Sequence, residues 1–367
     1  MPDPRVTKLA KVLVHYSTDV KKGQQVLIQT SPIADELTRA VYEEAVKAGA
    51  HPFVTNAVPG TKEAFLKFAS EEQLDYVSPI TKLIVETFDA YINIWTEYNT
   101  RDLSGIDPSR MARTRKAQSQ INKTFLQRSA EGAMHWAVTV YPNYAMAQEA
   151  DMSLRDYEDF VYGAGMLNED DPVVFWMAEG AKQQKLISWL KGRDKAVIKG
   201  SNADITLSIK ERSFIECSGK ANFPDGEIFT GPVEDSVNGW IRFKYPAIFS
   251  GQEITDIELW FENGKVVKEK ASKNQELLTS ALNTDDGSRF LGEWGIGTNY
   301  GIQRFTKNML FDEKLGGTIH FAVGAGYPES GSRNESGLHW DMLCDMADAE
   351  IVVDGDVFYK DGKTVVS

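Results

Sequence analysis

A change in hydrophobic pattern near residue 195 constrains the fold of this chain more than any other feature of its sequence. Before that point, strand-like apolar runs such as 25–30 and 90–95 alternate with segments of helical periodicity such as 34–48. After it, short segments with period-two alternation dominate, and Asn-Gly and Asp-Gly turns separate several of them. The first pattern is typical of an α/β layer with a largely parallel sheet, and the second is typical of antiparallel β structure.

The length of the chain agrees with this division. A chain of 367 residues is too long for one ordinary hydrophobic core. We therefore predict two domains, an α/β domain over residues 1–194 and an antiparallel, barrel-like β domain over residues 195–367. The predicted fold class is α/β plus mainly β.

The composition is that of a folded protein and disfavours several classes of partner. The apolar fraction is 42%, and the net charge is −13 with no basic cluster, which argues against nucleic acid or an anionic membrane surface as the main partner. No apolar run approaches the roughly 20 residues of a membrane span, and the first residues lack the apolar core of a signal peptide. We expect a soluble, cytoplasmic protein in which Cys217 and Cys344 are reduced.

Histidine is rare in this chain, and two of the five histidines stand close to a carboxylate. His320 and His339 bracket a stretch rich in glycine and serine, and Asp341 follows closely after His339. Imidazole and carboxylate are the ligands of borderline divalent metals, zinc above all. If these three groups converge in the fold, they form the metal centre of a candidate hydrolase.

Three glutamates upstream extend the candidate set. Glu227, Glu293 and Glu313 each lie near glycine. Small residues let the backbone approach closely, and loops built from them often carry functional side chains. These carboxylates are therefore candidates for the same centre.

The motifs around these residues resemble the M29 family of metallopeptidases. They occur in the order in which the family has them, and the resemblance is strongest over residues 222–346. The motifs are Gly-Glu-Ile-Phe-Thr-Gly-Pro, Leu-Gly-Glu-Trp-Gly-Ile-Gly-Thr-Asn, Asp-Glu-Lys-Leu-Gly-Gly-Thr-Ile-His, Gly-Tyr-Pro and His-Trp-Asp. The chain departs from the better-known members in a shorter loop between His320 and His339 and in a small offset of Glu313.

This resemblance implies two divalent metal ions per subunit. Zinc suits the available ligands best, and cobalt, manganese and magnesium are the alternatives. The implied ligands are Glu227, Glu293, His320, His339 and Asp341, with Glu313 as a sixth.

The same resemblance implies a metal-dependent aminopeptidase that releases N-terminal amino acids from peptides with a free N-terminus. Two metals can bind a bridging water, lower its pKa and polarise the scissile carbonyl. We expect Glu293 to bridge the ions, and a glutamate beside the metals to carry the proton of the water to the leaving amine. Tyr327 is expected to donate a hydrogen bond to the oxyanion. The resemblance also implies a homodimer, with residues 195–367 as the catalytic domain.

Two other functions are compatible with parts of the sequence. Glu227 and Glu293 could form the metal-free carboxylate pair of a glycosidase, which eight tryptophans support weakly. That function leaves the two histidines at ligand-like positions without a role. The chain could also be a non-catalytic scaffold that has lost its metals, although every ligand type that the motifs require is present.

Overall fold

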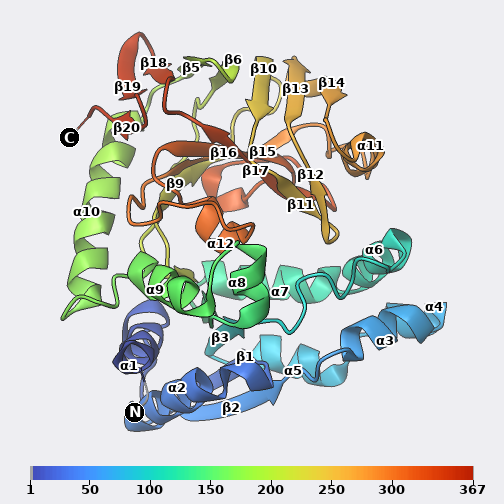
Figure 1. The fold of residues 1–367 in the computed structure, drawn as a ribbon, viewed down its shortest axis with the longest axis vertical. Coiled ribbons are helices and arrows are strands. Elements are labelled where there is room, and N and C mark those ends of the chain that lie inside the picture. Colours follow the sequence, from blue (N-terminus) through green and yellow to red (C-terminus); the bar gives the residue numbers. More distant parts are fainter. Residues whose placement is uncertain (1–2, 367) are drawn as a thin grey trace. The chain divides into compact units, whose positions relative to one another are not determined.

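The computed structural model describes residues 3–366 and divides into two compact units. Unit 1 is the chain up to Trp176 together with Gly219–Asp225, and unit 2 is Met177–Ser218 together with the chain from Gly226 onward. The sheets of the two units are separate (Figure 1). No helix within residues 3–366 combines the length and the apolarity that crossing a bilayer requires.

Unit 1 is built on a sheet in which each strand is parallel to the neighbours with which it pairs. The strand order is β2-β1-β3-β4-β8. The strands are β1 (Gln25–Thr30), β2 (His51–Asn56), β3 (Ala90–Trp95), β4 (His135–Val140) and β8 (Asn222–Phe223). The largely parallel sheet predicted from the alternation of strands and helices is confirmed.

The helices of unit 1 follow the predicted alternation. In α2 (Asp35–Lys47), Leu37, Val41 and Ala45 are fully buried and lie four residues apart, so they form the apolar stripe expected over 34–48. The other helical segments of unit 1 are α1 (Pro4–Lys11), the π-helix η1 (Val12–Ser17), the 3-10 turn η2 (Pro32–Ala34), α3 (Thr61–Phe68), α4 (Glu71–Asp75), α5 (Pro79–Thr87), α6 (Pro108–Ala117), α7 (Ser119–Ala130), α8 (Tyr144–Glu149) and α9 (Leu154–Ala164).

The two units divide within α10 (Pro172–Leu190). Leu186 and Leu190 near the end of this helix are only 6% and 2% exposed, and they belong to the core of unit 2. The packing therefore divides the chain at Trp176 and Met177. This point precedes the change in sequence pattern, which lies between residues 194 and 195. Whether 1–194 and 195–367 are domains that fold independently stays a prediction.

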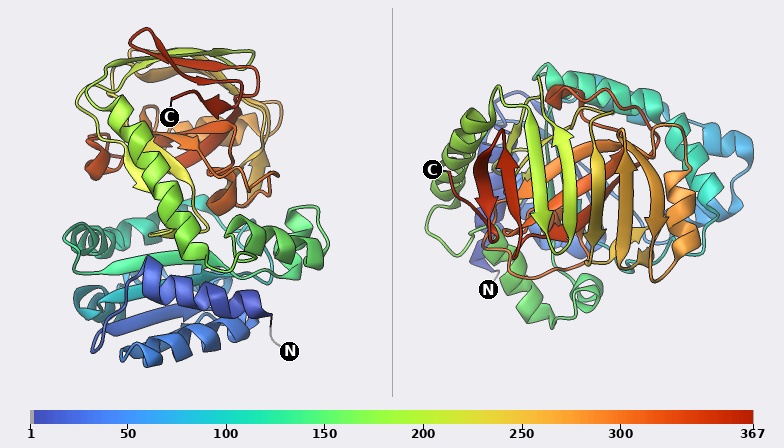
Figure 2. Two further views of the ribbon diagram at one scale, coloured as in Figure 1. Left: turned by 90° about the vertical axis from the view of Figure 1, so that its left-hand side faces the viewer. Right: turned by 90° about the horizontal axis from the view of Figure 1, so that it is seen from above.

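The larger sheet of unit 2 is antiparallel, and its strands lie side by side in the right-hand view of Figure 2. The strand order is β14-β13-β10-β6-β5-β18-β19-β20. The strands are β5 (Lys195–Gly200), β6 (Ala203–Ser208), β10 (Asn238–Phe243), β13 (Ile257–Glu262), β14 (Lys265–Lys270), β18 (Glu350–Val353), β19 (Asp356–Lys360) and β20 (Lys363–Thr364).

A smaller antiparallel sheet has the order β17-β16-β15-β9-β7. Its strands are β7 (Ile215–Cys217), β9 (Glu227–Thr230), β15 (Leu291–Gly297), β16 (Thr318–Gly324) and β17 (His339–Asp345). Further elements of unit 2 are the paired strands β11 (Ala247–Phe249) and β12 (Gln252–Ile254), the helices α11 (Gln275–Leu282) and α12 (Met309–Asp312), and the 3-10 turn η3 (Pro328–Ser330).

One apolar core joins the two sheets of unit 2. It contains Ile205 and Ile241 from the larger sheet and Trp294 and Phe321 from the smaller sheet, all fully buried. The predicted class, α/β plus mainly antiparallel β, is confirmed. The expected barrel-like closure describes unit 2 only loosely, because each of its two larger sheets ends in two edge strands.

Candidate metal centre

The smaller sheet of unit 2 presents its two faces to different environments. Along β15, β16 and β17, every second side chain enters the apolar core, as Trp294, Phe321 and Met342 do. Alternate residues of a strand point to opposite faces, so the residues between these point away from the core. Those intervening positions hold the candidate ligands. The period-two alternation of the sequence thus places the core-packing residues on one face of the sheet and the candidate ligands on the other.

Strand register brings the candidate ligands to neighbouring positions on this second face. Glu293 on β15 pairs with Ala322 on β16, and Ala322 pairs in turn with Asp341 on β17. His320 lies opposite Gly295, and Glu227 at the start of β9 lies opposite Gly297. Side chains at such positions on adjacent antiparallel strands are close enough to contact one another.

A glycine opposite His320 is required by the close approach of the imidazole ring. A Cβ atom on Gly295 would lie 1.9 Å from Cε1 of His320 and 2.1 Å from its Nε2. No side chain larger than hydrogen fits that space, so the ring can lie directly across β15.

The first group of candidate ligands consists of Glu227, Glu293 and His320. The Nε2 atom of His320 lies 3.3 Å from Oε2 of Glu227 and 3.3 Å from Oε1 of Glu293. One ligand atom from each of the three residues lies within 4.8 Å of the others. The group is thus compact enough to surround a single cation.

The second group shares Glu293 with the first. Nε2 of His339 lies 3.4 Å from Oε2 of Glu293 and 3.5 Å from Oδ2 of Asp341, and ligand atoms of these three residues also lie within 4.8 Å of one another. Glu293 therefore directs one carboxylate oxygen toward each imidazole.

Backbone carbonyls orient both imidazoles. Nδ1 of His320 lies 3.1 Å from the carbonyl oxygen of Glu313, and Nδ1 of His339 lies 2.7 Å from that of Ala325. When Nδ1 donates its proton to a carbonyl, Nε2 is left with a lone pair directed at the carboxylates. This is the tautomer that a metal ligand needs.

The electrostatics of the centre favour a cation. Burial raises the pKa of the Glu227 and Glu293 carboxyls, which are only 4% and 5% exposed. Burial opposes the charged form of both imidazoles, but the surrounding carboxylates prevail and raise the pKa of His320 and of His339 to about 10. Burial likewise opposes the charge of Asp341, yet His339 holds its pKa at about 2. The same field of negative charge would attract a divalent cation.

Two oxygen atoms support the fit of a metal. Oε2 of Glu227 and Oδ1 of Asp341 are buried, and neither accepts a hydrogen bond within the described part of the chain. Buried polar atoms without a partner are rare in folded proteins and call for a specific explanation. Carboxylate oxygens and imidazole nitrogens in these numbers suit zinc and similar divalent ions. The residues present therefore fit the metal that the motifs imply.

Glu313 reaches the border of the centre. Its backbone carbonyl lies against Nδ1 of His320, and its Oε1 pairs with Nζ of Lys314. Neither of the two compact ligand groups includes its carboxylate. A role for Glu313 as a sixth ligand stays a prediction.

Lys314 contacts the centre, although the sequence patterns assigned it no role. It is fully buried, and its Nζ lies 3.3 Å from Oε1 of Glu227. A lysine that follows two acidic residues usually belongs to a solvated charged run, so sequence alone favours an exposed side chain. Only its place in a motif with His320 pointed to the interior.

Tyr327 lies beside the second ligand group. Its ring centroid is 5.2 Å from that of His339 in an edge-to-face arrangement and 5.3 Å from that of Phe229. Burial, followed by the carboxylates of the centre, raises the pKa of its hydroxyl well above the ordinary value for tyrosine. The hydroxyl is therefore protonated at neutral pH and can donate a hydrogen bond.

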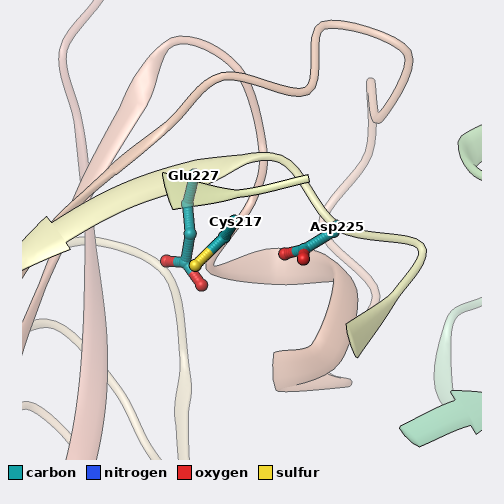
Figure 3. A group of neighbouring side chains, drawn as sticks. All are labelled: Cys217, Asp225 and Glu227. Atoms are coloured by element: carbon teal, nitrogen blue, oxygen red, sulfur yellow. The ribbon is translucent and has the colours of Figure 1, made fainter. Parts of the chain in front are cut away.

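The start of β9 fixes Glu227 on the other side of the centre. Glu227 pairs in register with Cys217 on β7, and Figure 3 shows the carboxylate and the thiol side by side. Asp225, also drawn in Figure 3, accepts a hydrogen bond of 2.8 Å from the backbone nitrogen of Gly219. Cys217 is half-buried and Cys344 is buried, and neither forms a disulfide within residues 3–366.

Known proteins match the chain along almost its whole length. The family model described as thermophilic metalloprotease (M29) matches residues 3–365. Aminopeptidase T of Thermus thermophilus is 27% identical over 403 aligned residues, covering 97% of this chain and 95% of that protein. Aminopeptidase AmpS of Bacillus subtilis is 25% identical over 386 aligned residues, covering 95% of this chain and 94% of that protein.

The fold also has a solved counterpart. Wild-type AmpT from Thermus thermophilus matches the structure with a TM-score of 0.84 over 99% of both chains, at 22% sequence identity. That likeness shows a shared fold, and the match of the family model shows shared ancestry. The resemblance that the motifs indicated is confirmed: the chain belongs to the M29 family of thermophilic metalloproteases.

Proposed function

We propose that this protein is a metal-dependent aminopeptidase with a dinuclear centre on the smaller sheet of unit 2. The observation that carries the proposal is the placement of Glu293, whose Oε1 lies 3.3 Å from His320 and whose Oε2 lies 3.4 Å from His339. A carboxylate with one oxygen in each ligand group is suited to bridging a metal pair. The chain is a metallopeptidase by family, and relatives named aminopeptidases support removal of N-terminal residues.

Each ligand group would hold one ion. Glu227, Glu293 and His320 would hold the first. Glu293, His339 and Asp341 would hold the second. We propose zinc, with cobalt, manganese or magnesium as alternatives, because carboxylate and imidazole ligands accept all of these ions. When bound, the ions supply the Lewis acidity that polarises the scissile carbonyl and lowers the pKa of the attacking water.

The protein side chains would move the proton and stabilise the developing charge. The attacking water gives its proton to a carboxylate of the centre, which returns it to the leaving amine. We assign this role to Glu293, the carboxylate that faces both imidazoles. Tyr327, protonated and adjacent to His339, would donate a hydrogen bond to the tetrahedral oxyanion.

The acidity of the centre suits a substrate with a free amino terminus. The Glu227, Glu293, Glu313 and Asp341 carboxylates surround it, and with the ions bound, the free α-amino group of a peptide would bind one of the ions or a neighbouring carboxylate. We therefore propose peptides with an unblocked N-terminus as substrates. Homodimeric assembly and a cytoplasmic location stay predictions from the resemblance and from the composition.

The structure offers little support for a metal-free glycosidase. Both Glu227 and Glu293 lie within 3.3 Å of His320, whereas a glycosidase needs two carboxylates that flank a sugar on opposite sides. The following experiment distinguishes a metallopeptidase from a non-catalytic scaffold that has lost its metals.

The decisive experiment measures metal content and chelator sensitivity together. Protein purified without chelator is expected to hold divalent metal and to hydrolyse an amino-acid p-nitroanilide, because its ligands converge. Dialysis against a chelator should abolish hydrolysis, and added Zn²⁺ or Co²⁺ should restore it. Protein without metal, or hydrolysis that ignores the chelator, would contradict the proposal.

A substitution locates the activity at this centre. His320→Ala should remove hydrolysis and lower the metal content, since Nε2 of His320 contacts two carboxylates, while the far-UV CD spectrum is retained. His51→Ala, at an exposed position on β2, is the matched control and should leave both unchanged. Full activity in His320→Ala would remove this residue from the active site.

A further inference from the structure

Lys314 is a buried cation that contacts the carboxylate of Glu227 in the first ligand group and that of Glu313 at the border of the centre. The residue is fully buried, and its Nζ lies 3.3 Å from Oε1 of Glu227 and pairs also with Oε1 of Glu313. An ammonium group taken out of water costs several kcal/mol unless it is paired, so a fully buried lysine needs such partners. The ion pairs also act on the carboxylates, because the ammonium group restrains the positions of the Glu227 and Glu313 side chains.

The backbone around Lys314 is hydrogen-bonded at both ends of the residue. Its amide nitrogen donates to the carbonyl of Phe311 at 3.1 Å, and its carbonyl accepts from the amide of Asn299 at 3.0 Å. The nearby Asp312 accepts hydrogen bonds from the backbone nitrogen and the hydroxyl of Thr306, at 2.7 and 2.9 Å. The turn that follows α12 thus fixes the backbone of Lys314, from which the side chain reaches the centre.

The two oxygens of Glu227 face different groups. Oε1 faces the ammonium of Lys314, whereas Oε2 lies 3.3 Å from Nε2 of His320 and accepts no hydrogen bond within residues 3–366. Rotation of the carboxylate about its last bond would exchange these oxygens or turn both away from His320. An ion pair on Oε1 opposes that rotation, and so keeps Oε2 directed at the ligand group.

We propose that Lys314 is a positioning residue for the metal centre. Its ammonium group pairs with one oxygen of Glu227 and one of Glu313, and this leaves Oε2 of Glu227 as a single, oriented metal ligand. This inference rests on the proposed metal centre and deepens it. Partners that orient a metal ligand in this way typically change metal affinity by about 10- to 100-fold when they are removed.

Simple electrostatics predicts the opposite effect of removing Lys314. A positive charge close to a bound cation repels it, so loss of the ammonium alone would strengthen metal binding. If Lys314 positions Glu227, its loss instead leaves the carboxylates of Glu227 and Glu313 without the cation between them, so that they repel each other and turn from their present places. The sign of the change in metal affinity therefore separates positioning from mere proximity of charge.

The test compares Co²⁺ binding by full-length protein and by Lys314→Met, both stripped of metal with a chelator. Methionine keeps the unbranched apolar stem of the side chain but ends one heavy atom earlier and has no charge. We expect Co²⁺ to bind Lys314→Met about 10- to 100-fold more weakly, as measured by calorimetry and by the visible absorption of bound Co²⁺. Lys307→Met is the control, because it also removes a lysine from an ion pair, and Glu253, which Lys307 contacts at 3.0 Å, is not a candidate ligand.

Equal or tighter binding of Co²⁺ by Lys314→Met would overturn the inference, because it would show that Lys314 does not orient the Glu227 carboxylate for metal binding. If Lys314→Met does not fold, by far-UV CD, Lys314→Gln replaces it, with a hydrogen-bond donor but no charge and with the same weaker binding expected. Wild-type protein that binds no Co²⁺ and hydrolyses no peptide analogue would instead contradict the proposed function itself.

Discussion

At the scale of single residues, the candidate centre depends on side chains whose chemistry is altered by their surroundings. Burial and the nearby carboxylates raise the pKa of Tyr327 well above its ordinary value, which keeps its hydroxyl a donor. The ring contacts with Phe229 and His339, at 5.3 and 5.2 Å between centroids, fix where that hydroxyl can point. An oxyanion donor must be protonated and held in place, and the raised pKa and the ring contacts of Tyr327 suit it to the proposed role.

Substitution of Tyr327 tests this role. Tyr327→Phe retains the ring packing and removes only the hydroxyl, so kcat should fall by about 10²- to 10³-fold with little change in KM or metal content. Steady-state hydrolysis of an amino-acid p-nitroanilide measures the effect. Tyr300→Phe is the matched control and should leave kcat unchanged, because the Tyr300 hydroxyl donates to the carbonyl oxygen of Gly362, which is not a candidate ligand. Wild-type kcat in Tyr327→Phe would rule out a catalytic hydroxyl.

At the scale of elements, the three strands β15, β16 and β17 both build the core and hold the candidate ligands. Each packs one set of alternate side chains, including Trp294 and Phe321, into the core of unit 2. Core packing therefore fixes the register, and a shift by one residue would exchange ligands for apolar residues. This coupling makes the geometry of the centre sensitive to the backbone of β15, and to Gly295 in particular.

Gly295→Ala tests that coupling. The added Cβ would lie 1.9 Å from the His320 ring, so either the ring or the strand must move. Overpacking of this kind should lower the free energy of unfolding by about 1–3 kcal/mol, and the displaced imidazole should weaken Co²⁺ binding. Urea unfolding and metal titration measure the two effects.

Gly105→Ala is the matched control for this substitution. At Gly105 no atom would lie within 4 Å of an added Cβ and φ is not positive, so the change should be neutral or slightly stabilising. A stable Gly295→Ala that binds metal normally would contradict the packing argument.

At the scale of the whole molecule, α10 determines where one unit ends and the next begins. The sequence pattern changes after this helix, but Leu186 and Leu190 pack into the core of unit 2. A helix that supplies core residues is part of the structure that it stabilises. The unit that holds the candidate centre therefore needs residues that precede the change in pattern.

Leu190→Ala tests whether α10 stabilises unit 2. Leu190 is 2% exposed, and its truncation should lower the free energy of unfolding by about 2–5 kcal/mol through lost burial and the cavity left behind. Met177→Ala, at a 63% exposed position of the same helix, should change it by no more than about 0.5 kcal/mol. Denaturant unfolding measures both. Equal stability of the two variants would show that α10 is dispensable to the core.

Much of the fold could be predicted from local patterns. The parallel sheet of unit 1 was predictable because β1 is a short, continuous apolar run and α2 carries the helical period of about 3.6 residues. The separation of unit 2 into two main sheets was not, since closure and strand order depend on contacts between residues far apart in the chain. For the same reason, barrel-like closure describes unit 2 only loosely, because two separate sheets enclose one core.

The sequence by itself determined the family, the fold class and the candidate ligands, because short motifs preserve residue types and spacing. Only the tertiary structure decided which oxygen of Glu293 faces His320 and which faces His339. It also placed Lys314, for which the local sequence favours the surface, at 3.3 Å from Glu227. Such pairings depend on strand register, which the packing of the whole core sets and no local pattern records.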